Sequence, residues 1–301
     1  MTEPCRILAL DGGGVHVIAQ AVLLTRIFAK YPDLFSQIDV FTGTSAGALL
    51  ALSLAQKGEN GLSFFTPETV ASMFKRNYSL KYIPSAGIVG AKYSNAALAE
   101  LLEREFGDLT VDQVARQVLV PAFKLSGPPE PLQKTPGEWH GQCFTNIKGK
   151  KCDVPVKDVA LRTTAAPTYF PIYQNYIDGG VVSNNPAALA LTECKNKGYD
   201  LAGMRILSLS GGTEQEHIST ENGNWGAMEW MSSIVDVLLG GNVYVSNLMC
   251  RELLKDNYHR FELPLSTDVP LDGTDQLITL IEAAEQADLS EVYQWIESNW
   301  N

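Results

Sequence analysis

The feature that most constrains this chain is a five-residue turn, Gly43-Thr44-Ser45-Ala46-Gly47. It follows the apolar run 38–41 and opens the Ala- and Leu-rich stretch 48–52, so it predicts a strand that turns sharply into a helix. Glycines on both sides of the serine suit such a turn, because it leaves no room there for side chains. The turn would lift the Ser45 hydroxyl to the end of a sheet, beside the amide-rich start of a helix. Turns of small residues that have no chemical role share this pattern, so the other motifs of the chain must show whether Ser45 has one.

Strand and helix patterns alternate along much of the chain. Apolar runs typical of buried strands occur at 6–10, 118–125, 142–147, 173–177 and 205–210. Stretches with helical spacing or a helix-start signal occur at 15–30 and 185–197. Such alternation predicts the α/β class, with a mostly parallel sheet covered by helices on both faces.

No linker or internal repeat divides the sequence, so we expect a single domain over residues 1–301. Its motif-bearing core would span about 5–212, followed by a C-terminal helical extension at 225–301. The stretch 225–254 predicts one long helix, or two helices broken at Gly240-Gly241. The Pro-rich stretch 127–141 predicts a surface loop or lid, and 214–226 predicts a second polar loop.

Composition excludes several classes of function. The 301 residues carry a formal net charge of −11, which argues against a nucleic acid polymer as partner and against strong electrostatic adhesion to anionic lipid. The five scattered cysteines form no C-x-x-C, so we expect no zinc site and no disulfide framework. Without a signal peptide or an 18-residue apolar run, the sequence predicts a cytoplasmic protein.

Two further motifs follow predicted strands: Asp11-Gly12-Gly13-Gly14 after 6–10, and Asp178-Gly179-Gly180 after 173–177. Ligands bind at the carboxyl edge of an open parallel sheet, where these motifs and the serine turn would meet. Consecutive glycines can turn their amides outward beside a helix start and form a site for negative charge. Asp178 is a candidate base for Ser45, because a free hydroxyl is a poor nucleophile at neutral pH. An aspartate that merely accepts turn amides is the alternative.

Together these motifs resemble those of the patatin-like phospholipase family. The resemblance extends to the Ala-rich block 164–171 and to Asn184-Asn185-Pro186, in matching order from about residue 5 to residue 212. It implies a three-layer α/β/α sandwich around a mostly parallel sheet. It also implies a Ser-Asp dyad without histidine, in which Ser45 is the nucleophile and Asp178 the base. By this resemblance the oxyanion amides would come from Gly12, Gly13 and Gly14.

The activity implied by the resemblance is hydrolysis of fatty acyl esters in phospholipid, lysophospholipid or neutral glycerolipid, through a covalent acyl-enzyme and without a metal or other cofactor. The partner would be lipid at a membrane surface, reached by transient peripheral contact. Some stand-alone bacterial members are switched on by a small nucleotide, but no residue here identifies such a site. Phe64, Phe65, Met73, Phe74 and Tyr78 lie in a segment that would either line an acyl-chain channel or pack in the core.

The chain departs from the family pattern directly after the glycine loop. The family usually places a basic residue and a glycine there, whereas this sequence has His16 and Val17. His16 would supply a positive charge only when protonated, which is a minority state for an ordinary imidazole at neutral pH. The departure raises the alternative of a catalytically weak binding protein with the patatin fold.

Two other classes fit part of the sequence. An α/β-hydrolase triad could use Ser45, Asp178 and either His217 or His259, but that fold usually places several strands before its nucleophile. A dinucleotide-binding module could use the glycine loop and Asp39, but residues 12–17 lack the final glycine of G-x-G-x-x-G.

Overall fold

The structure is a computed structural model that describes residues 4–74, 90–126, 139–212, 223–226, 230 and 233–300. Most of the two loops expected at 127–141 and 214–226 lies outside the described residues, as do Tyr78 and His217.

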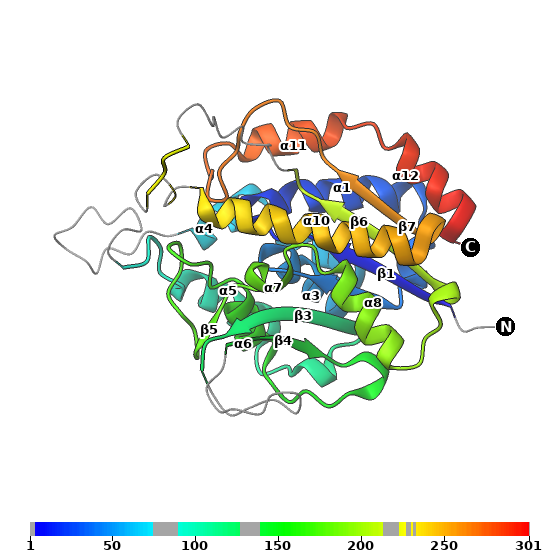
Figure 1. The fold of residues 1–301 in the computed structure, drawn as a ribbon, viewed down its shortest axis with the longest axis horizontal. Helices are drawn as coiled ribbons and strands as arrows, with labels where there is room; N and C mark the ends of the chain where they lie inside the picture. Colours follow the sequence, from blue (N-terminus) through cyan, green and yellow to red (C-terminus); the bar gives the residue numbers. More distant parts are fainter. Residues whose placement is uncertain are drawn as a thin grey trace.

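A sheet of seven described strands forms the centre of the molecule, in the order β4-β3-β2-β1-β6-β7, with β5 paired to β3 (Figure 1). The neighbouring pairs among β3, β2, β1, β6 and β7 are parallel, whereas β4 and β5 run antiparallel to β3. The mostly parallel sheet is therefore confirmed. The strands are β1 (Cys5–Leu10), β2 (Val40–Gly43), β3 (Gln117–Lys124), β4 (His140–Thr145), β5 (Tyr176–Ile177), β6 (Met204–Ser210) and β7 (Tyr258–Glu262).

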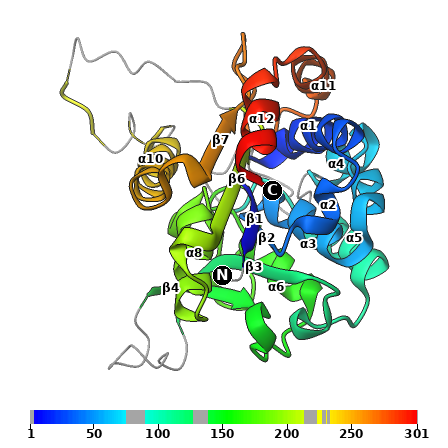
Figure 2. The same cartoon turned by 90° about the vertical axis from the view of Figure 1, so that its right-hand side faces the viewer.

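Helices cover both faces of the sheet. Alternate residues of a strand point to opposite faces, and in β1 Leu8 and Leu10 join the core beneath α1 (Val17–Lys30) and α3 (Ala46–Lys57). Ile7 and Ala9 join a second core beneath α8 (Ala187–Asn196) and α10 (Ile234–Leu254). Figure 2 shows α1, α3, α11 and α12 on one side of the strands and α8 and α10 on the other. This is the expected three-layer α/β/α arrangement.

Shorter elements complete the layers. The remaining helices are α2 (Leu34–Gln37), α4 (Pro67–Met73), α5 (Ala96–Phe106), α6 (Val156–Thr163), α7 (Gly180–Ser183), α11 (Leu277–Gln286) and α12 (Ser290–Trp295). Short stretches of tighter or wider helix are η1 (Gly14–His16), η2 (Gly58–Phe64), η3 (Val111–Gln113), η4 (Ile147–Gly149), η5 (Leu201–Gly203), η6 (Lys255–Asn257) and η7 (Ile296–Trp300). Across the described residues, no helix combines the length and hydropathy needed to cross a bilayer.

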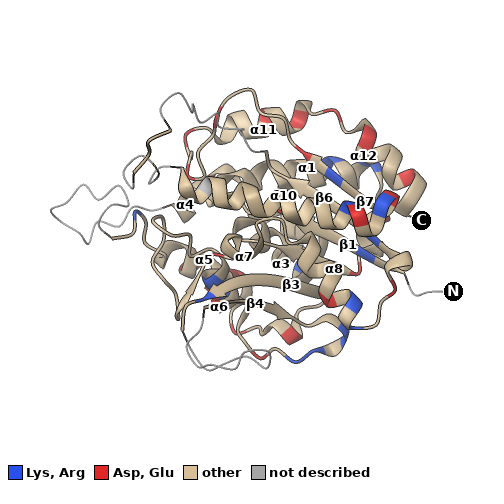
Figure 3. Cartoon of the chain, in the orientation of Figure 1, with Lys and Arg blue, Asp and Glu red and all other residues tan. Residues whose placement is uncertain are grey.

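Of the two possibilities left open for 225–254, the described residues show the unbroken helix, whereas the expectation of a purely helical extension at 225–301 is wrong. Helix α10 runs through Gly240-Gly241 without a break, because a glycine in a helix costs only about 1 kcal/mol and neighbouring contacts hold the helix in place. One such contact is made by Ser246, which is buried and donates to the Asn185 carbonyl at 2.8 Å. The region is also not purely helical, since β7 pairs with β6 at the edge of the sheet. Figure 3 shows α10 nearly free of charged residues until its carboxyl end.

Strands β2 and β5 meet head to head along β3. Strand β2 pairs with β3 as far as Thr42, which lies opposite Leu119. Strand β5 pairs antiparallel with Phe123 and Lys124, further along β3. Strand β4 occupies the other edge of β3 at those same two residues, so β5 lies on the edge that β2 has left. The carboxyl ends of β2 and β5 therefore converge. Asp178 reaches the site from an antiparallel strand, not from the parallel strand expected from the sequence.

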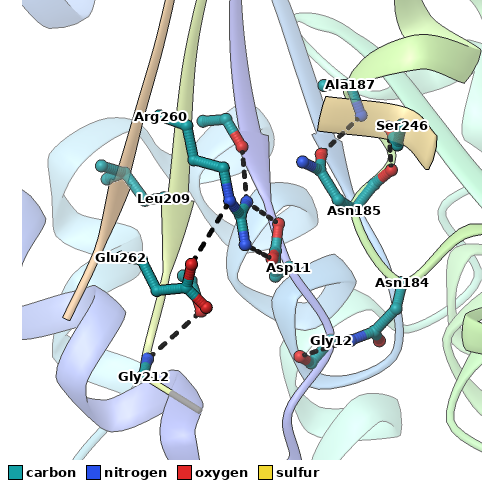
Figure 4. A network of polar contacts seen from close by, with 12 residues as sticks. Asp11, Gly12, Asn184, Asn185, Ala187, Leu209, Gly212, Ser246, Arg260 and Glu262 are labelled. Carbon is teal, nitrogen blue, oxygen red and sulfur yellow. Dashed lines mark hydrogen bonds and ion pairs between the residues drawn. The ribbon is translucent and has the colours of Figure 1, made fainter. Parts of the chain in front are cut away.

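A buried ion pair ties the edge strand β7 to the end of β1 (Figure 4). Arg260 donates from Nη1 to Asp11 Oδ1 at 3.1 Å and from Nη2 to Asp11 Oδ2 at 2.7 Å. The same Nη1 also donates to Ser208 Oγ at 3.1 Å. The side chains of Arg260 and Asp11 are 7% and 3% exposed. This two-point contact fixes the first residue of the glycine loop against the sheet.

We predict that Arg260→Met lowers the free energy of unfolding by about 3–5 kcal/mol, because it leaves the Asp11 carboxylate buried and unpaired. Urea denaturation of the wild type and the variant measures this difference. The double variant Asp11→Leu/Arg260→Met is the control and should recover much of the loss, since it removes both charges. A single variant as stable as the wild type would contradict the role given to the pair.

Candidate active site

Ser45 lies at the apex of the turn between β2 and α3, with φ 52° and ψ −125°. A residue other than glycine in such a conformation costs on the order of 1–3 kcal/mol and persists only where its surroundings hold it. A side chain at Gly43 would overlap the backbone of Gly47, and one at Gly47 would overlap the carbonyl of Asp11. Glycine is therefore required at both positions, because a side chain would not fit. The strand–turn–helix predicted from the sequence is confirmed.

The Ser45 hydroxyl and the Asp178 carboxylate are in direct contact. Ser45 Oγ donates to Asp178 Oδ2 at 2.7 Å, and the Gly180 amide donates to Asp178 Oδ1 at 2.7 Å. Asp178 is only 6% exposed. Burial raises the pKa of Asp178 to about 6, and the hydrogen bonds from Ser45 and Gly180 oppose that rise. A buried carboxylate with this pKa is a better proton acceptor than an ordinary one and is still mostly ionised at pH 7.

Backbone contacts hold these two residues in place. The Ser45 amide donates to Thr163 Oγ1 at 3.0 Å, and Thr44 Oγ1 donates to the Ser183 carbonyl at 2.7 Å. The Asp178 amide donates to the Ala165 carbonyl at 3.0 Å. The Ala-rich block after α6 thus positions the aspartate, which gives a physical reason for its place in the sequence motif.

The glycine loop does not present all three amides to the site. The Gly12 amide donates to the Asn184 carbonyl at 2.9 Å, and Asn184 Nδ2 donates back to the Gly12 carbonyl at 3.3 Å. The amide of Gly12 is therefore already engaged, which argues against its expected oxyanion role. Gly13 and Gly14 line the pocket beside Ser45 and Ala46. Within the described part of the chain, we find no acceptor for the Gly13 and Gly14 amides.

The C-terminal part of the chain closes over the glycine loop. Gly14 has φ 56°, and a side chain there would overlap the Leu271 carbonyl. That carbonyl also accepts the Val15 amide at 2.9 Å. Gly14 is thus required both by its conformation and by the close approach of Leu271, a contact that the sequence motifs did not indicate.

His16 does not replace the basic residue that the family usually has at this position. Its ring is 5% exposed, and Nε2 lies 2.7 Å from the Val269 carbonyl, to which it donates. Nδ1 lies 3.4 Å from the Gly211 carbonyl. Burial lowers the pKa of His16, so the ring is neutral near pH 7. His16 bonds the glycine loop to the Val269 segment and packs against Gly211, and it does not supply a charge to the site.

The serine and the aspartate face an apolar pocket. Met73 and Phe74, from the segment expected to line either a channel or the core, lie on its wall, whereas Phe65 is buried in the core and Phe64 packs against it. The other apolar lining residues are Leu49, Leu98, Ala166, Pro167, Tyr169, Phe170, Val181, Val235, Leu239 and Leu271. No lysine or arginine is among the described residues that line it. Such a wall suits an acyl chain.

Neither His259 nor Asp39 is placed for the role considered from the sequence. His259 stacks on Trp295 with ring centroids 5.6 Å apart and does not line the pocket. His217 lies outside the described residues. Asp39 accepts the Arg6 amide at 2.8 Å at the amino end of β2, whereas the glycine loop follows the carboxyl end of β1. Among the residues described, no group of three or more His, Cys, Asp or Glu side chains is placed to hold a metal ion.

Comparison with known proteins agrees with this geometry. The family described as "Patatin-like phospholipase" matches residues 8–191. The chain is 26% identical to "Protein teg" of Priestia megaterium, covering 98% of this chain and 99% of that protein. It is 27% identical to the "Putative sporulation hydrolase CotR" of Bacillus subtilis, with 98% of each chain covered.

A plant protein and a solved structure also align with the chain. "Patatin group M-3" of Solanum tuberosum is 25% identical over 82% of this chain and 72% of its own length. Among solved structures, VipD from Legionella pneumophila aligns over 94% of this chain and 67% of its own, with a TM-score of 0.43 and 14% identity. Because the family match covers more than half of the sequence and includes the serine turn and the aspartate, the chain belongs to the patatin-like phospholipase family.

Proposed function

We propose that this protein is a lipid acyl hydrolase of the phospholipase A or lysophospholipase type, with Ser45 as nucleophile and Asp178 as base. Family membership supports lipid acyl hydrolase activity in the broad sense. The observation that supports the specific proposal is the 2.7 Å hydrogen bond from Ser45 Oγ to Asp178 Oδ2 at the wall of an apolar pocket. A hydroxyl bonded to a buried carboxylate is the arrangement expected of an activated nucleophile.

In the first step Asp178 accepts the Ser45 proton while Oγ attacks the carbonyl carbon of an acyl ester. The carbonyl oxygen becomes negatively charged, and we assign its stabilisation to the amides of Gly13 and Gly14, together with the Ala46 amide at the start of α3. The Gly12 amide is omitted because it is bonded to Asn184. Loss of one such donor typically costs about 3 kcal/mol of transition-state stabilisation.

In the second step the tetrahedral intermediate collapses, and the ester C–O bond breaks. Asp178 returns the proton to the departing alcohol or lysolipid, which leaves an acyl ester on Ser45. Asp178 then accepts a proton from a water molecule as that water attacks the acyl-enzyme, and the fatty acid is released when Ser45 regains the proton. One carboxylate thus acts alternately as base and acid, so the mechanism needs no histidine.

The proposed substrate is phospholipid, lysophospholipid or neutral glycerolipid reached by transient contact with a membrane surface. The acyl chain would lie along the apolar wall formed in part by Phe74, Phe170 and Leu239. Phe74, Tyr93 and Phe170 form an aromatic cluster, and Tyr93 and Lys92 both bond to Asp272 next to Leu271. These contacts join the chain-binding wall to the segment that covers the glycine loop. Lipidomics of a membrane extract before and after incubation with the protein identifies the substrate.

We predict that Ser45→Ala abolishes ester hydrolysis and labelling by a fluorophosphonate probe. Asp178→Asn should lower kcat/KM by about 10²–10⁴, the usual contribution of a positioned general base. The control is Asp33→Asn, which removes an exposed carboxylate and should keep full activity. Thermal unfolding shows that each variant is folded. Near-normal turnover by folded Asp178→Asn would overturn the role given to Asp178, and a probe that fails to label the wild type would favour a catalytically weak binding protein.

We predict that kcat/KM rises with pH through a midpoint near 6 and then levels off above about pH 7. The pKa of Asp178 is raised to about 6, so the carboxylate that accepts the proton is lost as the pH falls below that value. The released fatty acid from a short-chain ester is quantified between pH 4.5 and 8. A profile with its midpoint near 4 would show that the base is an ordinary exposed carboxylate.

A further inference from the structure

Helix α10 places one polar side chain against the segment that follows Asp178. Asn242 accepts the Asn184 amide on Oδ1 at 2.8 Å and donates from Nδ2 to the Gly180 carbonyl at 2.6 Å. In an α-helix the amide of residue 184 would donate directly to the carbonyl of residue 180. The carboxamide of Asn242 therefore takes the place of the bond that would continue α7 at its carboxyl end, a contact that the sequence motifs did not indicate.

The two bonds require a side chain with one donor and one acceptor. A carboxamide has both, and its orientation is fixed here because the Asn184 amide can only donate and the Gly180 carbonyl can only accept. Helix α7 has only four residues, and a helix of that length is not stable by itself. The position of α7 therefore depends on contacts such as those made by Asn242.

Gly180 connects Asn242 to the proposed base. The Gly180 amide donates to Asp178 Oδ1 at 2.7 Å, while Ser45 Oγ donates to the other carboxylate oxygen. A side chain at Gly180 would crowd Asp178 Oδ1 and Leu239 of α10, so α10 packs closely on this residue. Asn242 thus holds the residue that fixes one oxygen of the carboxylate, which leaves the second oxygen directed at the serine.

Asn184 connects the same side chain to the glycine loop. The Asn184 carbonyl accepts the Gly12 amide at 2.9 Å, and Asn184 Nδ2 donates to the Gly12 carbonyl at 3.3 Å (Figure 4). A side chain at Gly12 would overlap Asn184 Oδ1, so the two residues are in close contact. Gly13 and Gly14, whose amides we assign to the oxyanion, follow directly in the chain. Asn242 therefore also determines how the glycine loop is held.

We propose that Asn242 is a positioning residue for the proposed hydrolysis: it holds Gly180 against the base and Asn184 against the glycine loop. The described residues that line the pocket do not include Asn242, so it acts through these two segments without touching the substrate. Its role in turnover rests on the proposed function, whereas its effect on Asp178 can be measured without any substrate.

The ionisation of Asp178 reports on this arrangement. Within the described part of the chain, burial raises the pKa of Asp178 to about 6, the bonds from Ser45 and Gly180 oppose the rise, and no charged side chain contributes. Loss of the bond from the Gly180 amide raises the pKa further, because that bond stabilises the ionised form. Two or three amide donors lower the pKa of a carboxyl by about two units, so one lost donor should raise it by about one.

Asn242→Leu tests the proposal, because leucine has a similar shape and neither a donor nor an acceptor. The pKa of Asp178, followed by carboxyl carbon NMR, should rise by about one pH unit from its value of about 6. With a hydrolysed ester, kcat at pH 7 should fall by about 10- to 100-fold, since a displacement of about 1 Å in a site can cost about 100-fold. KM should stay within about twofold, because substrate contacts are kept. The pH midpoint of kcat/KM should move upward with the pKa.

Ser246→Ala is the matched control on the same helix. Ser246 lies one turn after Asn242 and is buried; it accepts the Ala188 amide at 3.2 Å and donates to the Asn185 carbonyl at 2.8 Å (Figure 4). Its loss weakens the attachment of α10 to the start of α8. We expect this variant to lower the free energy of unfolding and to leave both kcat and the pKa of Asp178 nearly unchanged. An equal rise in that pKa in both variants would indicate general loosening of α10 and overturn the proposal.

Thermal unfolding shows whether each variant is folded. If Asn242→Leu does not fold, Asn242→Ala replaces it, because the smaller side chain causes no crowding, and the same rise in pKa is expected. A folded variant at Asn242 that keeps the wild-type pKa of Asp178 overturns the proposal, and so does a raised pKa with unchanged kcat. A wild type that hydrolyses no ester, with a pKa that still rises in Asn242→Leu, would contradict the proposed function and support Asn242 as the residue that positions Asp178.

Discussion

The contact between the Ser45 hydroxyl and the Asp178 carboxylate depends on how two strands share one edge of β3. Strand β2 leaves that edge after Thr42, and β5 enters it from the opposite direction at Lys124. The two carboxyl ends then face each other across a gap of a few residues. Residues 133 positions apart in the chain are thereby held within 2.7 Å. Because the carboxylate is buried there, its proton affinity rises into the range useful to a base at neutral pH.

The remaining parts of the site are arranged around this contact from both ends of the chain. Asp11 is fixed by Arg260, 249 residues away, and this anchors the loop that begins with Gly12. His16 reaches the Val269 carbonyl, and Leu271 lies against Gly14. The C-terminal part therefore belongs to the site, although the recognisable motifs end near residue 212. A neutral imidazole in place of the usual basic residue changes how the loop is held and leaves the contact between serine and aspartate intact.

Much of the site could be predicted from the sequence because it depends on local geometry. The turn around Ser45 requires small neighbours, and that requirement is visible in five consecutive residues. The pairing of the Gly12 amide with Asn184, the burial of His16 and the contribution of Arg260 could not be predicted, since each depends on a residue more than 170 positions away. The direction of β5 could not be predicted either, because a strand of two residues has no periodicity that would separate parallel from antiparallel pairing. Gly240-Gly241 suggested a break in α10, but tertiary contacts override weak helix propensity.

The most direct test of the account is the pKa of Asp178 itself, followed by carboxyl carbon NMR and assigned by the loss of one signal in an asparagine variant. We expect a pKa of about 6 in the wild type, set by burial. We expect a higher pKa when Ser45 is replaced by alanine, because the hydroxyl stabilises the ionised form. A pKa near 4 that does not respond to Ser45 would show that the two side chains do not meet in a buried site, and would contradict the account.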